Sequence, residues 1–102
     1  ALSGIAEDFA RQGLALTTTV LRAEVAVPPV PIGAALHVLA DEPVVCLSRV
    51  RHAQGAPVAL LHNYVRADLA PGLESKDLTH RTLFDLLEHD YGLPLAAARR
   101  EF

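Results

Sequence analysis

The sequence predicts an α+β fold in which an antiparallel β-hairpin and separate helices share one core. Two alternating apolar runs, Pro43–Arg51 and Pro57–Arg66, flank a Gln-Gly pair of the kind found in tight turns. A helical apolar stripe follows between Thr82 and Gly92. Because strands and helices do not alternate as βαβ units, the pattern favours α+β over a parallel winding.

The N-terminal half contributes three further elements. Ser3 can cap a first helix, with an acidic opening turn and Gly13 as its stop. From Leu14 to Val27, β-branched residues favour a strand, which a proline cluster ends. A short helical turn is predicted over Ile32–Leu39.

The C-terminal half begins with a loop over Asp68–Asp77. Thr82 then has the character of an N-cap, with Asp85 three residues later in a weaker form of the capping box. Gly92 ends the helix and Pro94 prevents its continuation. A strand-like pattern follows over Leu95–Phe102.

Composition excludes several classes of protein. The chain has 102 residues, which suits one domain, and 51% hydrophobic residues argue against disorder. No apolar run approaches a membrane span, and a net charge of −3 with scattered basic residues gives no footprint for duplex DNA. The single Cys46 is expected to be a buried, inert thiol in a reducing compartment, so we expect a cytoplasmic protein. Both ends look cut from something longer.

Arg49 and Arg51 are the leading candidates for chemistry. Two residues apart on a strand, they project from one face, where two guanidinium groups can clamp a carboxylate or phosphate. Spacing alone favours a simpler interpretation, in which both are solvent-facing arginines of an amphipathic strand.

The residues that accompany the arginines depend on the hairpin register. A two-residue loop at Gln54-Gly55 places Leu60 opposite Arg49, with His62 and Tyr64 on the same face. A loop one residue longer brings Leu61 and Asn63 there instead. The residues alone leave both registers open.

Other sites receive little support. The five histidines show no metal-ligand spacing, and no cofactor motif is present. Ser48, His62 and Asp68 could form a triad, but no nucleophile elbow accompanies them. Thr82 can cap its helix and also stand at an anion-binding helix start.

An ordered series of short motifs identifies a family. The series is Arg11-Gln12-Gly13, Thr19-Val20-Leu21, Glu42-Pro43-Val44-Val45, Arg49-Val50-Arg51, Gly55-Ala56-Pro57-Val58-Ala59, Tyr64, Asp68-Leu69-Ala70-Pro71-Gly72-Leu73, and the segment from Asp77-Leu78 to Tyr91-Gly92. In this order it resembles the UTRA domain, the effector-sensing domain of GntR-type bacterial transcription regulators of the HutC-like group. The resemblance runs from about Ile5 to Phe102.

The resemblance implies a chorismate-lyase-like antiparallel sheet with helices packed on it, enclosing a pocket for a small metabolite. Such domains normally continue for further strands, so residues 1–102 are expected to be a UTRA-like domain that is incomplete at its C-terminal end. Family members carry an upstream winged helix, which this chain lacks, and dimerise through the sensing domain. The expected partners are a small anionic effector, a second copy, and DNA only through that other domain, with no membrane partner.

The resemblance also implies the site residues. By position, Arg49 and Arg51 match arginines that hold the phosphate of a phosphosugar in some members, and Thr82 matches a helping hydroxyl. A family glutamate at position 61 hints that this position faces the arginines, which favours the longer loop and Asn63. The implied effector site is Arg49, Arg51, Asn63, Tyr64 and Thr82, with no catalytic or metal-binding residue.

Three departures from the family pattern narrow the class of ligand that is expected. Sugar-binding members have Ser or Thr where this chain has Ala6, glutamate where it has Leu61, and tyrosine where it has Phe84. Each change removes a polar contact that a sugar would use, so an anionic but otherwise more apolar effector, or a phosphonate-type ligand, is expected.

Two other functions are compatible with the sequence. The same fold supports a chorismate-lyase-like enzyme, although no convincing acid–base set is present. A dimerisation module without a pocket is the second alternative.

Overall fold

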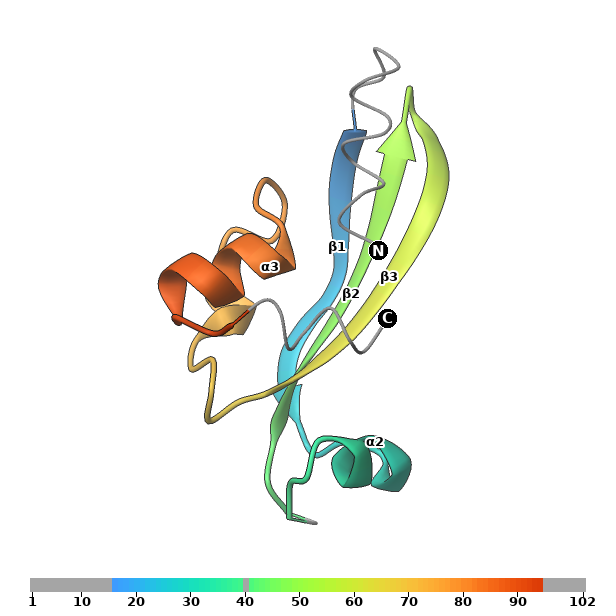
Figure 1. The fold of residues 1–102 in the computed structure, drawn as a ribbon. Coiled ribbons are helices and arrows are strands. Elements are labelled where there is room, and N and C mark those ends of the chain that lie inside the picture. The colour runs from blue at the N-terminus through green and yellow to red at the C-terminus, as the bar shows by residue number, and fades with distance from the viewer. Residues whose placement is uncertain (1–15, 40, 95–102) are drawn as a thin grey trace.

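A computed structural model describes residues 16–39 and 41–94, and these form an α+β unit built on one antiparallel sheet. The strands are β1 (Leu16–Ala26), β2 (Val44–Ala53) and β3 (Ala56–Arg66), in the order β1-β2-β3, so β2 is central (Figure 1). The α+β prediction is confirmed. The helix expected from Ser3, the position of Ala6 and the strand-like pattern 95–102 lie outside the described residues.

The β2–β3 hairpin closes through a two-residue turn. Ala53 pairs with Ala56, and Gln54 and Gly55 both have positive φ values of 53° and 84°, the geometry of a type I′ turn. The register then shifts between Arg51 and His52, and Val58 has no partner of its own in the pairing. This β-bulge adds one residue to β3.

The bulge changes which residues face the arginines. Arg49 pairs with Leu61 and Leu47 pairs with Asn63, so Asn63 lies on the face of Arg49. The register favoured through the family resemblance is confirmed, but the longer loop that was to produce it is wrong. The turn keeps two residues, and the extra residue sits within the strand.

The connection between β1 and β2 contains helix α2 (Val30–Ala35). The predicted helical turn over Ile32–Leu39 was therefore placed too late along the chain. Pro31 lies in the first helical turn, where the missing N–H has no partner to lose, so the proline cluster helps to start this helix as well as ending β1. His37, at φ 56°, follows its end.

The predicted loop over Asp68–Asp77 contains a 3₁₀ turn, η1 (Leu73–Ser75). Leu73 is fully buried and anchors this turn in the core. The segment is thus more ordered than its Pro-Gly composition predicted, because one apolar side chain fixes it.

The C-terminal helix begins as predicted. The Thr82 side chain accepts a hydrogen bond from the backbone N–H of Asp85 at 3.0 Å, and helix α3 (Leu83–Asp85) continues directly into a π-helical turn, η2 (Leu86–Asp90). Gly92 has φ 66°, and its N–H donates to the carbonyl of Glu88 at 3.1 Å, as in an αL ending of a helix. The π turn was not predicted.

This helical segment covers one face of the sheet (Figure 1). Between them lies the core, formed by side chains from the central strand, the η1 region and the helix. Its buried members are Val45, Leu47, Ala70, Leu73, Leu78, Leu86 and Leu87. Helix α2 lies away from this layer, at the end of the sheet where β1 leads into β2.

Candidate functional site

Arg49 and Arg51 project from β2 on the same face as the core. Strand alternation places Val45, Leu47, Arg49 and Arg51 in one row, so the row begins apolar and ends cationic. The two arginines therefore lie beside the buried layer, and the solvent-facing alternative does not apply to Arg49, which is only 3% exposed.

Arg49 is buried without a counter-ion among the residues that the structure describes. Its Nη2 donates to Oδ1 of Asn63 at 3.2 Å, while Nε and Nη1 are buried and have no hydrogen-bond partner. Burial, and secondarily the charge of Arg51, lowers the pKa of Arg49 from its ordinary value. Unpaired donors on a buried cation cost free energy unless an anion satisfies them.

Arg51 is held by the other flanking strand, β1. Its Nη1 donates to Oγ1 of Thr18, at 3.2 Å, and Thr18 pairs directly with Arg51 in the β1–β2 register. Sequence analysis did not include Thr18 in the site. From sequence, Thr17, Thr18 and Thr19 could point hydroxyls into a pocket, but β-propensity explains them equally well. The pairing of Thr18 with a residue 33 positions later has no local signal in the sequence.

The predicted site residues divide between the two faces. Asn63 contacts Arg49, whereas Tyr64 pairs with Cys46 and shares the opposite face of the sheet. The structure thus brings Arg49, Arg51 and Asn63 together and does not bring Tyr64 to them. Leu61, 4% exposed, is the residue paired with Arg49 and gives the site an apolar border.

Thr82 stands at the start of the helical segment that packs on the arginine face. Its neighbour Leu83 packs against the core cluster, which contains Leu47, two residues before Arg49. The Thr82 oxygen accepts the capping hydrogen bond, and its O–H remains a potential donor. The cap is confirmed; the contact with an effector stays a prediction.

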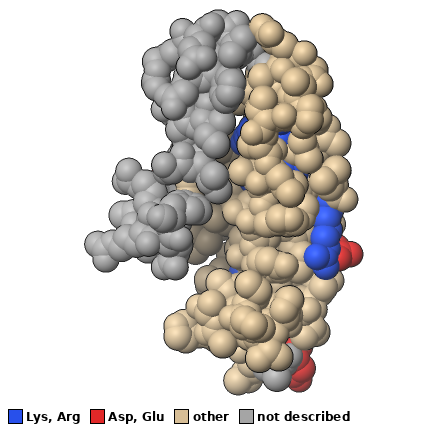
Figure 2. All heavy atoms as spheres, turned by 90° about the vertical axis from the view of Figure 1, so that its right-hand side faces the viewer, with Lys and Arg blue, Asp and Glu red and all other residues tan. Residues whose placement is uncertain are grey.

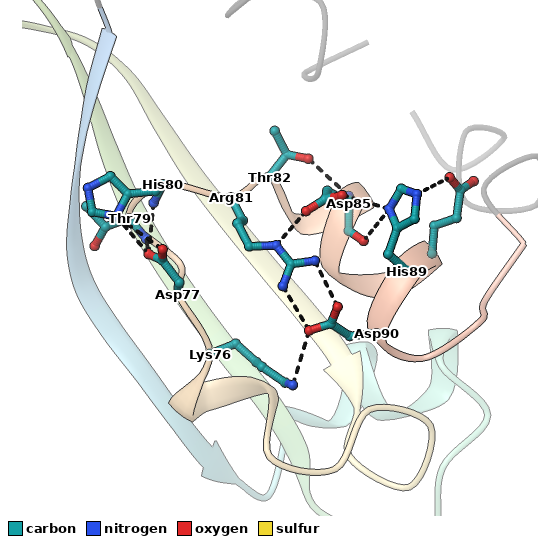
Figure 3. A network of polar contacts seen from close by, with 10 residues as sticks. Lys76, Asp77, Thr79, His80, Arg81, Thr82, Asp85, His89 and Asp90 are labelled. Carbon is teal, nitrogen blue, oxygen red and sulfur yellow. Dashed lines mark hydrogen bonds and ion pairs between the residues drawn. The ribbon is translucent and has the colours of Figure 1, made fainter.

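A cluster of charged side chains around Arg81 connects the helical segment with the η1 region (Figure 3). Arg81 points between two carboxylates: Nε donates to Asp85 at 2.6 Å, and Nη1 and Nη2 donate to Asp90 at 2.9 and 2.8 Å. Lys76 adds an ion pair to Asp90 at 3.1 Å. Hydrogen bonds from Arg81, then from Lys76, lower the pKa of Asp90 to about 2. This cluster is electrically compensated and ties the helix to the η1 loop.

The serine–histidine pair considered from sequence lies on the face opposite the arginines. Ser48 Oγ and His62 Nδ1 are 2.7 Å apart, and Asp68 instead accepts hydrogen bonds from Arg66 at 3.0 and 2.6 Å. The Ser48–His62–Asp68 triad is therefore not assembled. Cys46 is 2% exposed, and burial raises the pKa of its thiol, as expected for an inert cysteine.

The rest of the described surface offers few charged groups near the hairpin. Strand β3 carries no Asp, Glu, Lys or Arg before Arg66, and Figure 2, which views the molecule from that side, shows few side chains of these four types on the described surface. A shallow apolar cavity of about 230 Å³ lies beside α2, away from the arginines. Its lining residues are Pro28, Val30, Gly33, Ala34, Val38 and Leu39.

Residues 11–102 match the family model of the UTRA domain. The chain belongs to this family. UTRA domains are ligand-sensing domains of transcription regulators and bind small-molecule effectors, which agrees with a cationic site placed beside a core rather than on open surface. Comparison with curated proteins and with solved structures gave no match. In the described parts of this UTRA domain, no helix is long and apolar enough to cross a membrane.

Proposed function

We propose that this UTRA domain senses a small anionic metabolite, held by Arg49 and Arg51, for a transcription regulator of the GntR type. The observation that carries the proposal is Arg49, which is 3% exposed and has two guanidinium donors without a hydrogen-bond partner among the described residues. A buried cation of this kind is stabilised most by an anion that reaches its free N–H groups.

The body of the effector is proposed to be more apolar than a sugar. Leu61 stands opposite Arg49 in the register and offers no hydrogen bond, and Leu47 continues the apolar row beneath it. A hydroxylated ligand placed there would lose hydrogen bonds to water without replacing them. Glucosamine-6-phosphate is therefore expected to bind weakly.

Regulation would follow from differential affinity. An effector that binds one arrangement of the domain better than another shifts the population toward it, and the size of the shift is limited by that difference in affinity. In the proposed mechanism, a cytoplasmic homodimer transmits the bias to winged-helix domains outside residues 1–102, which contact DNA.

Thermal unfolding against a panel of anionic metabolites tests the proposal. We expect a compound with an anionic group and an apolar body to raise the melting temperature of the wild type, with no rise in Arg49→Met or Arg51→Met. Arg66→Met is the matched control, because Arg66 lies on the same sheet but on the opposite face and is paired with Asp68. The proposal fails if Arg49→Met and Arg51→Met respond to the same compound as well as the wild type does.

A further inference from the structure

Both arginines of the site are held by neutral oxygen atoms, one from each flanking strand. Thr18 of β1 accepts from Arg51 and Asn63 of β3 accepts from Arg49, each at 3.2 Å. Asn63 is two residues further along β3 than Leu61, the residue directly opposite Arg49, so Arg49 reaches it diagonally on the same face. The two guanidinium groups are therefore drawn toward opposite edges of the sheet.

A neutral acceptor orients an arginine without cancelling its charge. A hydroxyl or amide oxygen satisfies one N–H, whereas a carboxylate would also supply the opposite charge. The other three arginines of the described residues are each paired with a carboxylate: Arg22 with Glu24, Arg66 with Asp68, and Arg81 with Asp85 and Asp90. The two arginines of the site differ from the rest in this respect.

The positive charges of Arg49 and Arg51 also act on each other. Burial first, and then the charge of Arg51, lowers the pKa of Arg49, so the two like charges on one face disfavour each other. Their mutual repulsion, added to the burial of Arg49, is relieved in full only by a ligand that brings two negative charges.

We propose that Thr18 and Asn63 are positioning residues whose neutrality keeps both arginines uncompensated, so that the site selects a doubly charged anionic group over a singly charged one. This inference rests on the proposed function, because it takes the arginine pair as the place where the effector binds. It assigns to Thr18 and Asn63 the role of orienting the two arginines without neutralising their charge.

Two substitutions to aspartate test the role of neutrality. Thr18→Asp and Asn63→Asp each place a carboxylate where an arginine already has its partner, so each creates an internal ion pair. We expect the affinity for inorganic phosphate, measured by thermal shift at a pH where it is a dianion, to fall by at least about tenfold in each variant. Thr19→Asp is the matched control, because it makes the same change one residue away on the exposed opposite face.

The choice of anion tests the charge selection. In the wild type at constant ionic strength, phosphate is expected to stabilise the domain at lower concentration than nitrate. Equal stabilisation by phosphate and nitrate, or no stabilisation by phosphate, would overturn the selection of a dianion. The proposed function would still stand if another anion stabilised the wild type and this stabilisation were lost in Arg49→Met. Phosphate binding by Thr18→Asp and Asn63→Asp as tight as by Thr19→Asp would overturn the positioning role.

Folding is checked by circular dichroism. If Thr18→Asp does not fold, Asn63→Asp alone decides the positioning role, since it changes a different strand and a different arginine. Thr18→Val distinguishes a positioning role from a purely structural one. We expect this variant to fold but to bind phosphate more weakly, because Arg51 loses the oxygen that orients it. Thr18→Ser keeps that oxygen and should retain the phosphate affinity. Unchanged phosphate affinity in Thr18→Val would also count against the proposal.

Discussion

Arg49 and Arg81 occupy opposite electrostatic situations in the same small domain. Arg81 is about one third exposed and makes three hydrogen bonds to two carboxylates, while Arg49 is 3% exposed and has one neutral partner. The pKa of Arg81 is raised by its partners, and the pKa of Arg49 is lowered by burial. Arg49, whose charge is buried, therefore has no counter-ion among the described residues, whereas the more exposed Arg81 has two.

This contrast separates a structural arginine from a binding one. Ion pairs at the surface contribute little net stability, yet they are inexpensive because water solvates both groups. A buried cation without a counter-ion destabilises the domain, so we expect an anionic group from outside the described residues to pair with Arg49. We infer a ligand at Arg49 and a tether at Arg81, and the following variants test that division.

The largest expected effect comes from replacing each arginine by methionine. Arg49→Met should abolish stabilisation by anions and leave the melting temperature without ligand unchanged or higher, because a desolvated charge is removed and its volume kept. Arg81→Met should retain the anion response and lower the melting temperature. Thermal unfolding with and without phosphate measures both quantities, and a loss of anion response in Arg81→Met would break the division.

Thr82 follows Arg81 in the chain, caps the same helix and is also a predicted effector contact, so its replacement tests which role it has. Thr82→Ala should reduce the free energy of unfolding by about 1 kcal/mol through loss of the helix cap, as seen in urea denaturation. Thr82→Ser keeps the hydroxyl and should restore stability. If Thr82 also contacts the effector, Thr82→Ala will weaken anion binding and Thr82→Ser will not.

A smaller effect is expected from neutralising the tether while keeping its size. Arg81→Gln should lower the melting temperature by only a few degrees, because the pairs with Asp85 and Asp90 lie in contact with solvent. The difference from the wild type should shrink as salt is added, since salt screens exposed pairs. A salt-independent loss would mean that the tether acts through packing.

The smallest effect concerns acid stability. The pKa of Asp90 is lowered from 3.8 to about 2 in the folded domain, so its contribution is fully present above pH 3.8 and is lost as the pH falls through about 2. In acid unfolding followed by circular dichroism, Arg81→Gln should therefore be closer in stability to the wild type at pH 2 than at pH 6. An unchanged difference at the two pH values would contradict this assignment.

Local signals allowed much of the fold to be predicted from sequence. Thr82 and Gly92 mark the helix because a cap and a left-handed ending are determined by neighbouring residues. The alternation of apolar and polar residues predicted the hairpin, but it did not predict the β-bulge that sets the strand register. A longer loop and a two-residue turn with a bulge place Asn63 on the same face, so the resemblance gave the right pairing for the wrong reason.

The candidate site was predicted only in part because its decisive properties are tertiary. Spacing placed Arg49 and Arg51 on one face, but the burial of Arg49 and its lack of a counter-ion depend on segments distant in sequence. Thr18 enters the site through pairing with β2, and Tyr64 falls on the other face through strand alternation. Neither placement has a signature in the residues around it.

The unpaired Val58 has a consequence for how this hairpin tolerates changes in length. Ala59 pairs with Arg51 on one side of the bulge and Pro57 pairs with His52 on the other, so removing Val58 joins two pairs that are already in register. Such a deletion would straighten β3 and leave Asn63 beside Arg49. The hairpin can therefore lose a residue at this point without exchanging the side chains that line the proposed anion site.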